Sequence, residues 1–120
     1  MSKRAYTFDV VGLRYRLEQS EIDSLAEACE GEPLKGKLKR EPKNEADPNA
    51  VKVMVQRPRE KSWKHIGYLR KEPAAVFAQA LDRGTSVVKQ VRLTYINTEH
   101  GWGSVKVVLE NAVDKPKIQT

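Results

Sequence analysis

Three polar side chains that can form specific hydrogen bonds gather on one short segment of the sequence. Asn44, Asp47 and Asn49 lie between two runs in which apolar residues alternate with polar ones. Asn and Asp side chains often bond the backbone two residues further on, and Pro42 and Pro48 fix φ, so one interpretation is that these residues build a turn. The carboxylate of Asp47, flanked by cationic residues, could also accept a hydrogen bond from a hydroxyl group of a bound partner. The loop sequence leaves both interpretations open.

The segments on either side of this loop are predicted to be β-strands. Residues 34–39 alternate apolar or small side chains with Lys35, Lys37 and Lys39, and residues 51–56 alternate three valines with Lys, Met and Gln. A period of two is typical of half-buried strands. The loop is therefore expected to be fixed at both ends.

The same alternation recurs elsewhere, and we expect about six short strands in all. The other four are predicted near residues 6–11, 63–69, 90–95 and 105–110. Strands of this size must close into a barrel or pack a helix on one face to protect their edges. The predicted fold is mainly β with one or two helices, a small OB-like or SH3-like barrel. The segment from Gly12 to Arg16 is expected to be a turn that displays two arginines around an aromatic ring.

A first helix is predicted after this turn. Ser20 is a plausible N-cap, and Gly31 closes the helix. One apolar stripe follows helical spacing and consists of Ile22, Leu25, Ala26 and Cys29. The single cysteine, Cys29, is expected to be a small core residue rather than a nucleophile.

The strongest helix signals occur later, between residues 72 and 84. Glu72 is expected to cap the helix, Pro73 to occupy its first position and Gly84 to end it. The buried face is predicted to consist of Val76, Phe77, Ala80 and Leu81.

Length and composition indicate one domain that spans residues 1–120, with a polar tail over 114–120. The chain has 120 residues, of which 39% are hydrophobic, enough for one modest core. No apolar run approaches the roughly 20 residues of a membrane span, and the charged start is not followed by an apolar signal segment. We therefore expect no membrane association and an intracellular protein, cytoplasmic or nucleoid-associated if its source is bacterial.

Charge is distributed unevenly along the chain. The net charge is +6, yet there is no Lys or Arg between Arg16 and Lys35. Six acids occupy that interval: Glu18, Glu21, Asp23, Glu27, Glu30 and Glu32. A basic surface with one acidic segment is typical of a polyanion binder, because each neutralised phosphate releases counterions. The alternative is that the charge only keeps a small domain soluble.

The sequence offers little for catalysis or metal binding. There is no glycine-rich phosphate loop of an ATP-driven motor, and no nucleophile signature among Ser, Cys and His. His65 and His100 have no neighbouring set of ligand residues. We expect no catalytic residue, no metal and no cofactor.

Three blocks of the sequence resemble the HIRAN domain family. This domain is found as the amino-terminal module of enzymes of the helicase-like transcription factor class. They are Val10 to Tyr15, Arg40 to Val53 with its Asn and Asp residues, and Ile66 to Glu72. The blocks follow the family's order over roughly residues 8–84, and the last third of the chain matches only as generic strands.

The resemblance implies a modified OB-like barrel that binds single-stranded DNA at its 3′ end. It assigns phosphate contact and base stacking to Arg14 and Tyr15, and acceptance of a hydrogen bond from the terminal 3′-hydroxyl to Asp47. Tyr68 and Lys71 would reach phosphates from the segment before the second helix. A guanidinium fork suits phosphate oxygens and a helix N-terminus attracts anions, which supports these roles.

One position departs from the family pattern. The residue before the loop Asp is aromatic in the well-studied member, whereas this chain has Ala46. A base there would stack on Tyr15 alone unless Trp63, Trp102 or Tyr68 supplies a second ring.

The leading functional prediction is a non-enzymatic module that binds single-stranded DNA at 3′-hydroxyl ends and acts in DNA repair or replication-associated processing. The lysines of residues 35–39 would extend its groove, and a DNA-processing protein is a conceivable partner. An alternative is an interaction adaptor that recruits such a protein through a sheet edge or the acidic segment. A third class, a nuclease subunit, is disfavoured because metal ligands are missing.

Overall fold

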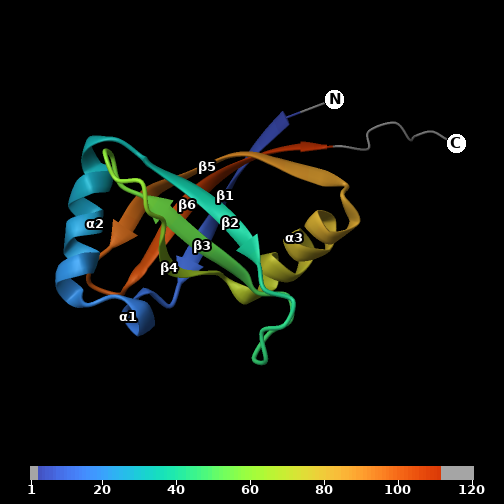
Figure 1. The fold of residues 1–120 in the computed structure, drawn as a ribbon, viewed down its shortest axis with the longest axis horizontal. Helices are drawn as coiled ribbons and strands as arrows, with labels where there is room; N and C mark the ends of the chain where they lie inside the picture. Colours follow the sequence, from blue (N-terminus) through green and yellow to red (C-terminus); the bar gives the residue numbers. More distant parts are fainter. Residues whose placement is uncertain (1–2, 112–120) are drawn as a thin grey trace, which may run out of the picture.

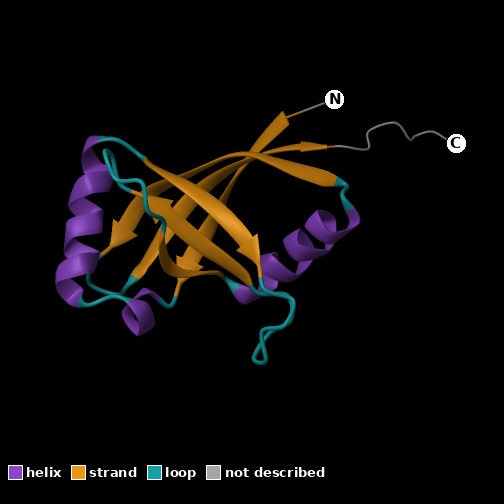
Figure 2. Cartoon of the chain, in the orientation of Figure 1, coloured by secondary structure: helices purple, strands orange, loops and turns teal. Residues whose placement is uncertain are grey.

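Six antiparallel strands close into a barrel in the computed structural model, which describes residues 3–111 (Figures 1 and 2). The elements in chain order are β1 (Lys3–Val11), α1 (Leu13–Arg16), α2 (Gln19–Gly31), β2 (Leu34–Arg40), β3 (Val51–Gln56), β4 (Lys64–Leu69), α3 (Lys71–Arg83), β5 (Ser86–Asn97) and β6 (Trp102–Asn111). Around the barrel the order is β1-β4-β3-β2-β5-β6. The predicted fold class is confirmed. The polar tail expected over 114–120 lies outside the described residues.

The barrel consists of two three-stranded halves that meet at two short seams. Long pairings join β1 to β6 and β6 to β5, and others join β2 to β3 and β3 to β4. Only Val10 and Val11 of β1 pair with β4, and only Leu34 and Lys35 of β2 pair with β5. The β1–β4 seam leaves no room for a side chain at Gly67, because a Cβ there would collide with the carbonyl oxygen of Val11. The ends of the strands at this seam are therefore tightly fixed.

The barrel interior is filled by the apolar positions that the alternation predicts. In β3 the three valines at 51, 53 and 55 are buried while the residues between them are half-buried. Among the residues described, no polar or charged side chain is fully buried. Burial of apolar surface therefore accounts for the stability of the core.

Helix α2 lies at one end of the molecule and α3 at the other (Figure 1). The predicted stripe of α2 faces the core, with Ile22, Leu25 and Cys29 buried. The predicted cap at Ser20 is wrong, because the helix begins at Gln19 with Glu18 as its N-cap. The Glu18 amide donates to Glu21 Oε1 at 3.0 Å, which satisfies one donor at the helix start.

The start of α3 also differs from the prediction. The N-cap is Arg70, and Pro73 is the third helical residue, where its missing N–H removes no bond because the first four amides of a helix have no internal partner. The Arg70 amide donates to the Asp9 carbonyl at 3.1 Å and its guanidinium to Asp9 Oδ2. These contacts to β1 fix the chain before the helix, so Glu72 is not the cap. The end at Gly84, with φ of 71°, is as predicted.

The buried face of α3 is only partly the predicted one. Phe77 is buried, and its ring centroid lies 5.4 Å from that of Phe8 in β1. Val76 is 73% exposed, whereas Ala74 and Ala78 are buried. Buried positions i, i+3 and i+4 follow from helical periodicity, and Val76 falls outside this stripe.

The turn predicted after β1 is instead the one-turn helix α1. Gly12 precedes it with φ of 82°, a conformation that glycine adopts without strain. None of the helices described is long and apolar enough to cross a membrane.

Candidate nucleic-acid interface

An open groove of about 250 Å³ lies beside the β1–β4 seam. The β2–β3 loop forms one wall, and the end of β1 and the junction between β4 and α3 form the rest. Its lining residues are Val11, Asn44, Ala46, Asp47, Ala50, Tyr68, Leu69 and Lys71. Three of the five predicted site residues, Asp47, Tyr68 and Lys71, thus meet in one place.

The β2–β3 loop is shaped by its own polar side chains. Asn44 Oδ1 accepts hydrogen bonds from the amides of Ala46, at 2.9 Å, and Asp47, at 3.0 Å. The Asn44 side-chain amide donates to Glu41 at 3.0 Å. The turn-building interpretation is therefore confirmed for Asn44.

Asp47 combines a structural contact with an available acceptor. Its Oδ1 accepts a hydrogen bond from the Asn49 amide at 2.9 Å, and its carbonyl accepts one from the Ala50 amide at 3.0 Å. No hydrogen bond to Oδ2 is found from any residue in the described range 3–111. The carboxylate is half-buried and lines the groove. One oxygen holds the loop, and the other is free to accept.

Tyr68 forms the aromatic part of the groove. It is half-buried in β4 opposite Val11 of β1. Its hydroxyl donates to Glu41 Oε1 at 2.9 Å, and its ring meets the edge of the His65 ring at 4.9 Å between centroids. Burial, reinforced by the bond to Glu41, raises the pKa of the Tyr68 hydroxyl, which therefore stays a neutral donor.

Glu41 is a residue that the sequence analysis did not single out. The bond from Asn44, and then that from Tyr68 and the charge of Lys52, hold the pKa of its carboxyl below the ordinary value. Lys52 Nζ lies 3.8 Å from Glu41 Oε2. Glu41 and Tyr68 are 27 residues apart in the sequence, and no local pattern indicates such a contact.

The cationic side of the groove is Lys71, the first residue of α3. Its side chain is exposed, and no acid within residues 3–111 forms an ion pair with it. Arg40, the last residue of β2, ties the loop to α3 through two bonds to Asp82, at 3.0 and 2.9 Å, and one to the Ala50 carbonyl at 3.0 Å. Asp82 is the last residue but one of α3, so these bonds hold the base of the loop against the end of the helix.

Arg14 and Tyr15 do not line this groove. They lie on α1, which begins two residues after Val11, a residue that lines the groove. Tyr15 is four residues from Val11, so its Cα cannot be further than about 14 Å from the Cα of Val11. Tyr15 is 95% exposed. Arg14 instead reaches the turn between β5 and β6, where it donates to the Glu99 carbonyl and packs against Gly101.

Of the rings considered as replacements for the missing aromatic at position 46, only Tyr68 lines the groove with Ala46. Trp102 packs edge-on against Tyr95 with centroids 5.5 Å apart. Trp63 lies under the Lys37 ammonium, 4.5 Å from the ring centroid.

The remaining candidates for chemistry are the Cys29 thiol and clusters of metal-ligating side chains. Burial raises the pKa of the Cys29 thiol to about 11, which confirms its interpretation as a core residue. Within residues 3–111 no three His, Cys, Asp or Glu side chains gather closely enough to hold a metal ion.

The barrel fold resembles that of two solved structures. The fold is similar to the crystal structure of the HIRAN domain of human HLTF, with a TM-score of 0.60 and 20% sequence identity, covering 88% of this chain and 74% of that one. It is also similar to the crystal structure of a protein from Lactobacillus plantarum, with a TM-score of 0.57 and 19% identity, covering 91% of this chain and 100% of that one. No curated protein matches the sequence.

The family model described as HIRAN domain matches residues 3–110, nearly the whole chain. HIRAN domains are known as nucleic-acid-binding modules rather than catalytic domains. On the strength of this match, the chain belongs to the HIRAN domain family.

Proposed function

We propose that this domain is a non-catalytic module that binds single-stranded DNA and recognises its 3′-hydroxyl end in the groove between the β2–β3 loop and α3. The observation that carries the proposal is the convergence in one groove of a carboxylate, an aromatic ring and a cation, of which one carboxylate oxygen and the cation have no partner among residues 3–111. These are Asp47, Tyr68 and Lys71.

Each group has a chemistry that suits the end of a strand. Asp47 Oδ2 can accept a hydrogen bond from the terminal hydroxyl, since a carboxylate accepts and never donates. Lys71 and the amides of the first turn of α3 attract the adjoining phosphate. Tyr68 offers part of its ring to the last base, in place of the aromatic residue missing at position 46.

Arg14 and Tyr15 would hold the strand as it leaves the groove. Tyr15 is almost fully exposed directly beyond the β1 end, and an exposed ring is ready to stack on a base. Arg14 is held by the β5–β6 turn, while its remaining N–H groups can meet a phosphate.

The test compares fluorescent oligonucleotides that end in a 3′-hydroxyl or a 3′-phosphate. The hydroxyl form should bind more tightly, since a terminal phosphate would meet the Asp47 carboxylate with like charge. Equal affinities for the two ends would remove the claim of end recognition.

Two variants separate recognition from loop structure. Asp47→Asn keeps an oxygen that can accept from the Asn49 amide, so the loop should hold its shape while discrimination between the ends falls. Asp47→Ala removes both functions. If Asp47→Asn discriminates as the wild type does, the carboxylate charge is not the sensor.

A second candidate, an adaptor that recruits a partner protein, is favoured by one observation. Five of the six acids in and beside α2 are exposed, and within residues 3–111 only Glu21 forms an ion pair, with Lys64 at 2.9 Å. A pull-down from nuclease-treated lysate distinguishes the candidates: full retention of a partner by a domain that binds no oligonucleotide would favour the adaptor.

A further inference from the structure

The outer face of the β2–β3–β4 half of the barrel is basic and runs into the groove. Its lysines on β2, Lys35, Lys37 and Lys39, are all exposed. No ion pair to any of the three is found within residues 3–111. Alternate residues on a strand lie about 6.6 Å apart, close to the spacing of successive phosphates in an extended nucleic-acid strand.

Strand register makes this face continuous with the groove. Lys39 of β2 pairs with Lys52 of β3, and Lys52 pairs in turn with Tyr68 of β4. Residues directly opposite each other on antiparallel strands share a face. A row of side chains therefore leads from the β2 lysines to Tyr68, which lines the groove.

An aromatic ring lies on the same face, further from the groove. Trp63 comes just before β4, five residues from Tyr68, which corresponds to about 17 Å along a strand. It is half-buried, and the Lys37 ammonium covers its ring at 4.5 Å from the centroid.

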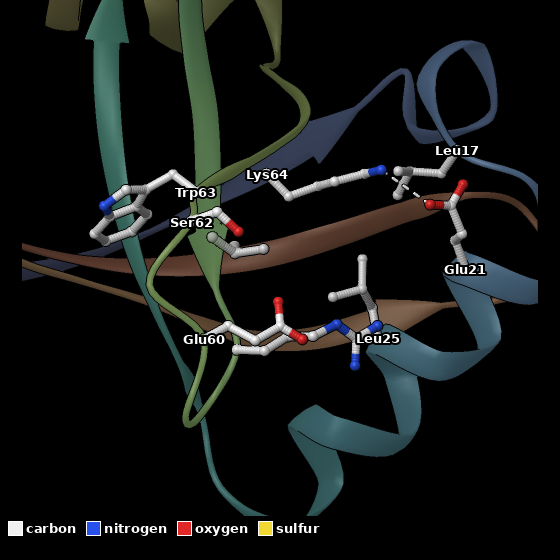
Figure 3. Close-up of a pocket in the computed structure, with 9 residues that line it drawn as sticks. Leu17, Glu21, Leu25, Glu60, Ser62, Trp63 and Lys64 are labelled. Carbon is white, nitrogen blue, oxygen red and sulfur yellow. Dashed lines mark hydrogen bonds and ion pairs between the residues drawn. The ribbon is translucent and has the colours of Figure 1, made fainter.

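Figure 3 shows that Trp63 does not point into the small cavity that it borders. Its ring extends toward β2, while neighbouring Lys64 points the opposite way to reach Glu21. The ring therefore lies against the outer face that carries the exposed β2 lysines and not against α2.

A nucleic-acid base can take the place of the Lys37 ammonium on the Trp63 ring. An exposed contact between an ammonium and a ring contributes less than the stacking of a nucleic-acid base on an aromatic side chain. The displaced ammonium would remain within reach of the backbone phosphates, so the lysine gains a partner when the base arrives.

We propose that a DNA strand whose end is held in the groove continues across the outer face of β2, β3 and β4, where one base stacks on Trp63 and Lys37 moves from the ring to a phosphate. This inference rests on the proposed function, since the groove fixes where the strand begins. Stacking on Trp63 is a second contact, which only longer strands can reach.

Oligonucleotide length tests the path. We would measure the affinity of a thymidine trinucleotide, below the roughly 4–16 nucleotides that an OB fold covers, and of a decanucleotide. Trp63→Leu should weaken binding of the decanucleotide about tenfold and leave the trinucleotide unchanged, whereas Trp63→Phe, which keeps a ring, should retain most of the affinity.

Lys37→Ala provides an independent variant, because Lys37 is exposed and its loss should not affect folding. It should also weaken only the decanucleotide. Lys106→Ala is the matched control: Lys106 is an exposed strand lysine on β6, in the other half of the barrel, and its loss should leave both affinities unchanged.

The outcomes separate this inference from the proposal on which it rests. If the trinucleotide binds and neither Trp63→Leu nor Lys37→Ala affects the decanucleotide, the path is wrong and the groove stands. If neither oligonucleotide binds the wild-type domain, both proposals fall.

Discussion

At the scale of single residues, the groove depends on side chains that have both a structural and a binding contact. Asp47 divides its two oxygens between the Asn49 amide and the open groove. Tyr68 gives its hydroxyl to Glu41 and leaves part of its ring at the groove. Substitutions that remove one contact and keep the other are therefore the most informative.

Tyr68→Phe removes only the hydroxyl bond to Glu41. We expect the free energy of unfolding to fall by about 1 kcal/mol, because the bond is charge-assisted but partly exposed to solvent. Affinity for single-stranded DNA should persist, since the ring remains, and Tyr68→Ala should lose it. Urea denaturation and an oligonucleotide titration measure the two effects, and equal loss of affinity in both variants would show that the hydroxyl, not the ring, matters for binding.

His65 gives the stability of the domain a dependence on pH. Burial, and then the charge of Arg16, lowers the pKa of its imidazole, so the folded state favours the neutral ring. The contribution of the neutral His65 ring to stability is complete above the pKa of about 6.5 that histidine has in the unfolded chain. It is lost as the pH falls through the lower pKa of the folded state. Stability should therefore decrease on acidification from pH 7 to 5.

The measurement is denaturant unfolding at several pH values in that range. Glu41, whose pKa is also lowered, loses its contribution to stability only below its unfolded pKa of about 4.3, so between pH 7 and 5 the change is expected from His65. His65→Gln should flatten the slope between pH 7 and 5. An unchanged slope in this variant would assign the effect to another group.

At the scale of elements, the turn between β5 and β6 holds the arginine of α1. Gly101 has φ of 70°, and a Cβ there would lie 2.8 Å from Cγ of Arg14. Gly84, at the end of α3, has nearly the same φ of 71° but open space around it. The two glycines form a matched pair that separates backbone strain from displacement of Arg14.

Both Gly101→Ala and Gly84→Ala should lower the free energy of unfolding by about 1–2 kcal/mol through left-handed strain. Only Gly101→Ala should also weaken DNA binding, because it pushes Arg14 from its place. Thermal or urea unfolding and an oligonucleotide titration of the two proteins check this. Equal affinities would mean that Arg14 does not act on the strand from this position.

At the scale of the whole molecule, the net charge of +6 should govern binding. This charge is unevenly distributed, because six acids gather in the segment around α2. The logarithm of the affinity for single-stranded DNA should fall linearly with the logarithm of salt concentration, by about 0.7 for each phosphate neutralised. Lys71→Ala should reduce this slope by about one such contact. The control Lys106→Ala should leave it unchanged, and a flat salt dependence in the wild type would contradict a phosphate-binding surface.

Local features of the sequence determined the elements of this protein. Alternation in residues 34–39 and 51–56 predicts strands because a pleated strand turns successive side chains to opposite faces, whatever the rest of the chain does. The stripe of α2 and the glycine end of α3 are equally local. Where the predictions fail, at the caps of both helices and at Val76, a contact or a periodicity outside the motif decided the outcome, as Asp9 did for Arg70.

Only the tertiary structure decided how the site is assembled. Val11, Asp47 and Tyr68 meet because one short seam pairs β1 with β4 and because the β2–β3 loop is tied to α3. The tertiary structure also directs Arg14 toward the β5–β6 turn and pairs Tyr68 with Glu41. Such contacts depend on strand register and barrel closure, which arise from the packing of distant segments, so the sequence alone named the residues while the fold determined which of them share a groove.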